Sequence, residues 1–93
     1  MDSIQSDIDS IKIEFPCEYP IKVMGKNSDE FSDIILKIIR RHAPGLRDEN
    51  INFRPSRNKN YLAVNVIIYA TGTQQLKALF DDLKASGLVS MVL

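Results

Sequence analysis

The chain has 93 residues and a mass of 10.5 kDa, which is enough for one domain with a single core and too little for two. Twelve basic residues balance twelve acidic ones, and this zero net charge argues against a dedicated nucleic-acid binder or a basic membrane-surface binder. With one cysteine and one histidine, the chain cannot form an internal disulfide or a multi-cysteine metal centre, so no metal or cofactor is predicted.

Residues 1–12 are predicted to form an acidic N-terminal arm, followed by a single domain over residues 13–93. Ile4, Ile8 and Ile11 repeat at helical spacing, but the stretch is short and rich in aspartate and serine. Because isolated short helices are marginal in water, we expect this arm to be flexible or only loosely docked. The prolines that follow it favour extended backbone leading into the first strand.

The first half of the domain is predicted to contain one strand and one helix. The strand runs from Tyr19 to Met24 and ends at Gly25, and a helix capped by Asn27 or Ser28 follows it. Apolar residues at helical spacing mark the buried side of this helix: Phe31, Ile34, Ile35, Ile38, Ile39 and, at its end, His42. The sequence Ala43-Pro44-Gly45 then ends the helix.

The second half is predicted to begin with an edge strand from Ile51 to Ser56. Ile51 and Phe53 of this strand are expected to face the core. Pro55 indicates an edge position, because proline has no backbone N–H to donate to a neighbouring strand. Residues 57–60 are rich in asparagine and basic side chains and are predicted to form a hairpin loop.

Tyr61 to Ala70 is predicted to be the longest strand, and its apolar residues on both faces indicate a central position. The second helix is expected to bury a stripe of four residues: Leu76, Leu79, Phe80 and Leu83. Gly87 ends this helix, and a last strand from Leu88 to Leu93 has Val89 and Met91 in phase.

The order βαββαβ predicts an α+β, ferredoxin-like split βαβ fold. Its antiparallel sheet has the strand order 4-1-3-2, with both helices on one face. The other face has no helix to cover it and is predicted to be an interaction face that presents Met24, Tyr61, Ala63, Asn65, Ile67 and Tyr69. Three occupants remain open for this face: the segment from Ile11 to Tyr19, a second copy of the chain in a homodimer, or a ligand.

Several segments of the chain resemble the YbeD-like family of small bacterial proteins. They are Phe15-Pro16, Tyr19 to Gly25, Arg41 to Gly45, Pro55 to Tyr61 and Val89 to Leu93, and the resemblance runs from about residue 13 to the C-terminus. It implies a form of the predicted fold similar to ACT domains, which are small regulatory modules of amino-acid metabolism. It also implies a link to lipoate metabolism. The family offers no agreed catalytic residues, so none is assigned here and no enzyme activity is expected.

The loop after the first strand and the tip of the hairpin are predicted to lie at the same end of the sheet. Together they gather six residues as a candidate ligand site: Gly25, Lys26, Asn27, Ser28, Arg57 and Lys59. Backbone N–H groups at a helix N-terminus and nearby cations suit a small anionic effector such as a carboxylate or phosphate. The resemblance to ACT domains also implies an effector site near this loop. The alternative is a solvated loop, because Asp29, Glu30 and Asp33 partly cancel the positive field.

The remaining reactive or charged residues favour structural interpretations. His42 continues an apolar stripe, so we expect it to cap the helix or pack on the core. Cys17 lies beside Glu18, which disfavours a reactive thiolate, and nothing in the sequence supports a Cys17–His42 dyad. A basic cluster is predicted to complement the helix dipole, with an acidic partner surface as the alternative: Lys37, Arg40, Arg41 and Arg47.

These patterns predict a non-catalytic regulatory or protein-interaction module with an unidentified protein partner. The alternative is an RNA-binding module that uses the open sheet face. RNA recognition on such a sheet needs aromatic residues on its two central strands, and the third strand supplies Tyr61 where the first strand has Lys22. No apolar run can span a bilayer and no signal peptide is recognised. We therefore expect a soluble, cytoplasmic protein without a membrane partner.

Overall fold

The computed structural model describes residues 14–93, so the predicted arm at residues 1–12 lies outside the described residues. The elements are β1 (Cys17–Lys26), α2 (Asp29–His42), the short 3-10 helix η1 (Asp48–Asn50), β2 (Ile51–Pro55), β3 (Tyr61–Ala70), α3 (Thr73–Ala85) and β4 (Val89–Val92). This order confirms the predicted βαββαβ arrangement. None of the helices in residues 14–93 has the length and apolar character that crossing a bilayer requires.

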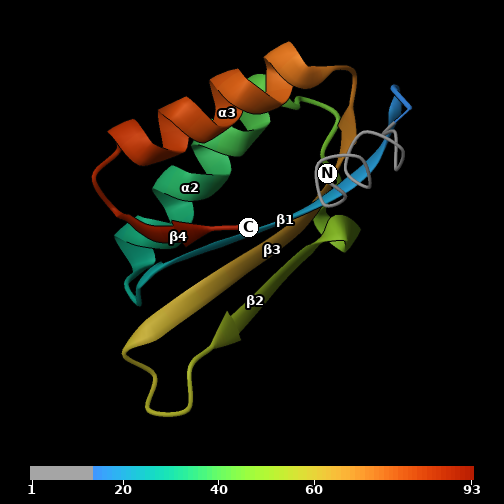
Figure 1. Cartoon of the computed structure of the whole chain (residues 1–93). Coiled ribbons are helices and arrows are strands. Elements are labelled where there is room, and N and C mark those ends of the chain that lie inside the picture. Colours follow the sequence, from blue (N-terminus) through green and yellow to red (C-terminus); the bar gives the residue numbers. More distant parts are fainter. Residues whose placement is uncertain (1–13) are drawn as a thin grey trace, which may run out of the picture.

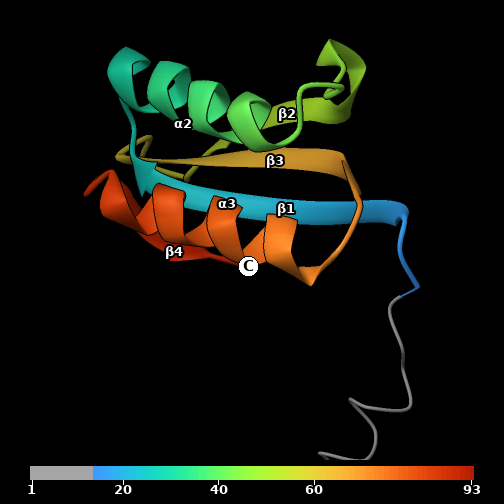
Figure 2. The ribbon, with the colours of Figure 1, turned by 90° about the horizontal axis from the view of Figure 1, so that it is seen from above.

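The four strands form one antiparallel sheet in the order β2-β3-β1-β4, as predicted. Figures 1 and 2 show α2 and α3 side by side over the same face of this sheet. The edge position expected from Pro55 is confirmed, because it ends β2 at the border of the sheet. The fold is therefore the ferredoxin-like α+β fold, with one face of the sheet left without a helix.

Strand β1 begins earlier than expected and is as long as β3, because Cys17 already pairs with Ala70. Pro20 does not interrupt it. The backbone N–H and C=O of Lys22 bond with Leu93, so Pro20, two residues earlier, also turns toward the β4 side. The described pairing of β4 with β1 does not reach Pro20, so its missing N–H costs no ladder hydrogen bond.

The core lies between the two helices and the sheet. Its fully buried side chains come from all the long elements: Ile21, Val23, Phe31, Ile35, Ile39, Val64, Val66, Ile68, Leu79 and Leu83. Ser28 caps the N-terminus of helix α2, because its Oγ accepts a hydrogen bond from the backbone N–H of Phe31 at 3.0 Å. Ser28 is therefore the cap, rather than Asn27.

Gly25 is a packing glycine. A Cβ at this position would collide with the aromatic ring of Phe31 and with the carbonyl oxygen of Leu88. Glycine at this position therefore allows α2 and the segment before β4 to approach the backbone of β1 more closely than any larger residue would. Gly87 has φ 75°, which explains a glycine at the end of α3.

Two predicted burial patterns are wrong, and both lie at the borders of the sheet. Phe53 is paired with Val64 and shares its helix-facing side, yet 47% of Phe53 is exposed because the helices do not extend over edge strand β2. In β4 a register shift places Val92 opposite Val23 and turns Met91 outward. A bulge adds one residue to the strand, which reverses the alternation that the sequence predicts.

Candidate functional site

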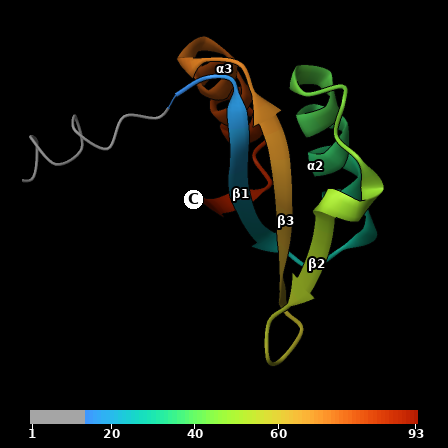
Figure 3. The same ribbon diagram turned by 90° about the vertical axis from the view of Figure 1, so that its right-hand side faces the viewer.

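The open face is the side of the sheet opposite to α2 and α3, which Figure 3 shows in front of the helices. Three apolar or aromatic side chains of β3 are exposed on it: Tyr61 at 45%, Ile67 at 40% and Tyr69 at 63%. The neighbouring residues Leu62, Val66 and Ile68 are buried on the other side. The alternation predicted for this strand is thus confirmed, and the exposed residues follow one central strand along the face.

Ala63 lies on the open face, where the sequence placed it, but it is only 7% exposed. Ala63 is paired with Met24 on one side and with Arg54 on the other, and both neighbours have much longer side chains. A methyl group between them is shielded. Met24 itself is half-buried, as is Asn65, so the apolar surface concentrates at the two ends of the strand rather than at its middle.

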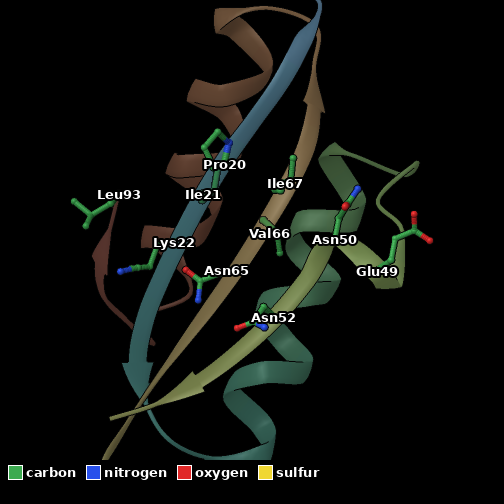
Figure 4. Close-up of a pocket in the computed structure, with 10 residues that line it drawn as sticks. All are labelled: Pro20, Ile21, Lys22, Glu49, Asn50, Asn52, Asn65, Val66, Ile67 and Leu93. Carbon is green, nitrogen blue, oxygen red and sulfur yellow. The ribbon is translucent and has the colours of Figure 1, made fainter. Parts of the chain in front are cut away.

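A hollow of about 510 Å³ lies on the open face and is lined mostly by apolar atoms. Figure 4 shows its residues, which come from all the strands but β4 and from the segments beside them: Pro20, Ile21, Lys22, Glu49, Asn50, Asn52, Asn65, Val66, Ile67 and Leu93. Pro20 and Ile67 are paired in the sheet and form its apolar floor. Lys22, Asn65 and Asn52 form a polar row across the three strands.

The two charged residues of the hollow, Lys22 and Glu49, lie on opposite sides of it (Figure 4). Lys22 belongs to β1, and Glu49 belongs to η1 on the far side of β3. The side chains around this hollow supply apolar contact, amide hydrogen bonds and one charge of each sign. Such a set suits binding. The sequence predicted that Asn65 and Ile67 lie on this face. It did not predict Glu49 and Asn50 here, because they belong to η1, a turn that no local pattern indicates.

One alternative for covering this face is ruled out for the described residues. Cys17 to Tyr19 were considered as part of a covering segment, but they form the start of β1 and pair with β3. Phe15 and Tyr19 pack against the main core instead. The remainder of the proposed covering segment, residues 11–13, lies outside the described residues.

The predicted ligand loop and the hairpin tip do lie together. The backbone N–H of Asn27 donates to the carbonyl oxygen of Asn60, and its side-chain amide donates to that of Lys59, both at 3.0 Å. However, Gly25 is buried and the Ser28 hydroxyl is used as the helix cap. Lys26, Arg57 and Lys59 are exposed. Anion binding by these cations stays a prediction.

His42 does more than end its helix: its side chain links α2 to α3. The imidazole Nε2 donates to the Asp82 carboxylate at 2.6 Å, and Arg41 lies 3.5 Å from the same oxygen. The His42 hydrogen bond is the main reason why the pKa of Asp82 is lowered. Desolvation raises this pKa, and the charges of His42 and Arg41 lower it further. Gln75 donates to the His42 carbonyl at 2.8 Å and so satisfies the helix end. Asp82 and Gln75 could not be assigned these roles without the tertiary structure.

The basic cluster is largely neutralised by nearby acids. Arg40 pairs with Asp48 at 2.7 Å, and Arg47 pairs with Glu49 at 3.4 Å. These contacts are exposed and individually weak, but they match the structural interpretation of the cluster. Within residues 14–93, the acidic, histidine and cysteine side chains form no group of three or more that could hold a metal ion.

Two solved structures share the fold. Protein HP0495 from H. pylori has a TM-score of 0.72 with 16% identity, over 88% of this chain and 86% of that one. The ACT domain from GTP pyrophosphokinase of Chlorobium tepidum has a TM-score of 0.65 with 18% identity, over 83% of each chain. Identities this low concern the fold alone, and they confirm the predicted ACT-like form of the ferredoxin-like fold.

Sequence relatives are much closer. A UPF0250 protein of Ectopseudomonas mendocina is 52% identical over 89 residues, covering 95% of this chain and 97% of the relative. A UPF0250 protein of Azotobacter vinelandii is 49% identical over the same length and with the same coverage. The family described as "Protein of unknown function (DUF493)" matches residues 10–93. The chain therefore belongs to the DUF493 family, in agreement with its resemblance to YbeD-like proteins.

Proposed function

We propose that this protein is a non-catalytic interaction module that binds a protein partner through the open face of its sheet. The observation that carries the proposal is the exposure of Tyr61, Ile67 and Tyr69 along one central strand. Exposed apolar surface of this kind is costly to leave in water and is typical of docking surfaces. Aromatic residues, especially tyrosine, are enriched at such contacts.

A regulatory role for this module is supported by the fold it shares with the ACT domain of a GTP pyrophosphokinase. The YbeD-like resemblance supports a connection with lipoate metabolism, and the cytoplasmic location stays a prediction. In this proposal the open face receives the protein partner, and the exposed cations Lys26, Arg57 and Lys59 at the end of the sheet receive a small anionic effector. The two surfaces meet where Lys26 pairs with Tyr61, so each is tested with variants of its own.

A protein partner suits the open face better than RNA does. Tyr69 and Tyr61 stand on β3 as stacking residues would, but the paired strand offers Glu18 beside Tyr69. A carboxylate beside the most exposed aromatic ring repels a phosphate backbone. The charge of the whole chain is also zero, which gives no general attraction for nucleic acid.

The proposal is tested by capture from an extract of the native cell, with purified protein held at low concentration as bait. Wild-type protein and two variants, Tyr69→Ser and Phe53→Ser, are compared. Phe53 is a matched control, because it is an exposed aromatic residue on the opposite side of the sheet. We expect one set of proteins to bind the wild type and Phe53→Ser and to be lost with Tyr69→Ser.

The same set on all three baits would contradict a role for the open face. Saturable binding of a short RNA that shifts the NMR signals of Tyr61 and Tyr69 would instead contradict a protein as the partner of this face. The effector is tested separately, by NMR titration with amino acids and lipoyl compounds. Shifts at residues 26–28 that persist in the double variant Arg57→Glu, Lys59→Glu would remove these cations from the site.

A further inference from the structure

We propose that the open face also binds a second copy of this chain, about a two-fold axis that runs along β3. In this arrangement Lys22 of each copy meets Glu49 of the other. This inference rests on the proposed function in one respect, because partner binding and self-association would both use the open face. It names a further occupant, whose binding would hide the face from other partners.

The charges on the two sides of the hollow are the first argument. Lys22 lies on the β1 side of the hollow and Glu49 on the β2 side, so a half-turn about an axis along β3 places the β1 side of one copy over the β2 side of the other. A two-fold interface brings residue i onto residue j and j onto i, so one surface charge of each sign gives two ion pairs. Lys22 has no ion pair with another side chain in residues 14–93, and Glu49 has only an exposed contact with Arg47.

The residues near the axis are suited to meeting themselves. Ile67 and Tyr69 lie on β3 itself, so each would face its own counterpart and remove apolar surface from water. Asn65, between the two charged sides, carries both a donor and an acceptor and can therefore pair with its own copy. The η1 segment borders the hollow on one side only, so it would lie over the open β1 side of the other copy (Figure 4).

The edges of the sheet favour face-to-face packing over strand addition. Edge strand β2 has five residues and ends in Pro55, and edge strand β4 has four. Beyond β4 the exposed border of β1 carries Pro20. Short strands and prolines at edges are the features that prevent a sheet from extending into a second molecule.

The size of the face sets the strength that we expect. At about 3.3 Å per residue along a strand and about 4.8 Å between strands, the face offers about 500 Å² per copy. The total of about 1,000 Å² is at the lower limit for a specific interface. The expected assembly is therefore a weak dimer in rapid exchange with monomer, rather than an obligate one.

Sedimentation equilibrium of the purified full-length protein tests this, from low micromolar to near-millimolar concentration. We expect a monomer–dimer equilibrium for the wild type, weakened at least about tenfold by Lys22→Glu, because like charges then face each other twice. The double variant Lys22→Glu, Glu49→Lys restores opposite charges and should recover most of the association. Lys77→Glu, on an exposed position of α3, is the control for charge reversal.

A wild type that stays monomeric at every concentration would overturn the inference. So would a double variant as weak as Lys22→Glu, provided that circular dichroism shows both to be folded. The two proposals fail independently. Capture from extract without self-association removes the dimer alone, whereas self-association without capture removes the proposed partner binding alone.

Discussion

The two faces of β3 differ more than any other pair of surfaces in this molecule. Ile67 and Ile68 are consecutive and chemically identical, yet 40% of the first and 1% of the second are exposed. The pleat of the strand and the one-sided placement of the helices create this difference, because every second side chain lies under α2 or α3. One face therefore maintains the fold, while the other can change without unfolding it.

The sharpest test of this difference replaces each isoleucine in turn. We expect Ile68→Ala to lower the free energy of unfolding by about 2–5 kcal/mol, through lost burial and the cavity left behind. Ile67→Ala should cost less than about 1 kcal/mol, because much of its side chain is already in water. Urea denaturation of both variants gives the comparison. Equal losses would mean that the open face is covered in solution.

Gly25 tests the buried side from the opposite direction, by adding atoms. Gly25→Ala forces a methyl group into Phe31 and the Leu88 carbonyl, so we expect a loss of about 1–3 kcal/mol from overpacking. Gly45→Ala is the control, since no atom lies within 4 Å of the added Cβ there. Thermal unfolding at fixed concentration ranks the two. A stable Gly25→Ala would show that α2 can shift away from the sheet.

The smallest expected effect concerns the contact between the two helices above the core. Because its pKa lies below the ordinary aspartate value of 3.8, Asp82 stabilises the folded state above that pH and loses this effect as the pH falls through its folded-state pKa. Asp82→Asn should therefore lower the urea midpoint near neutrality and match the wild type in strong acid. Asp81→Asn, an exposed neighbour, should show no such convergence. Parallel pH profiles for both variants would contradict the role of the His42–Asp82 contact.

Local patterns predicted the faces of the central strands because alternation in a long strand directly reflects what lies on each side. Tyr61, Ile67 and Tyr69 were assigned to the open face on this basis, and their exposure confirms it. Alternation did not predict burial where the exposure of a side chain depends on what covers it rather than on the face to which it points. Phe53 points to the core side but extends beyond the helices, and Ala63 points to the open side but is shielded by Met24 and Arg54.

The parts of the site that could not be predicted depend on segments far apart in the chain. The hollow needs η1 beside β3, and the His42–Asp82 contact joins two residues that are forty positions apart in the chain. The bulge in β4 is another example, because only the pairing with β1 reveals the extra residue. In each case the local sequence is compatible with several tertiary partners.

The close approach at Gly25 also bears on the order in which the chain completes itself. The carbonyl of Leu88 and the ring of Phe31 both lie close to Gly25, so the segment that contains Leu88 covers a part of the core that the earlier elements leave exposed. Until residues 88–93 dock, the aromatic side chain of Phe31 in α2 is uncovered on the side where Leu88 will lie. A chain without residues 88–93 would therefore have an incomplete core around Phe31.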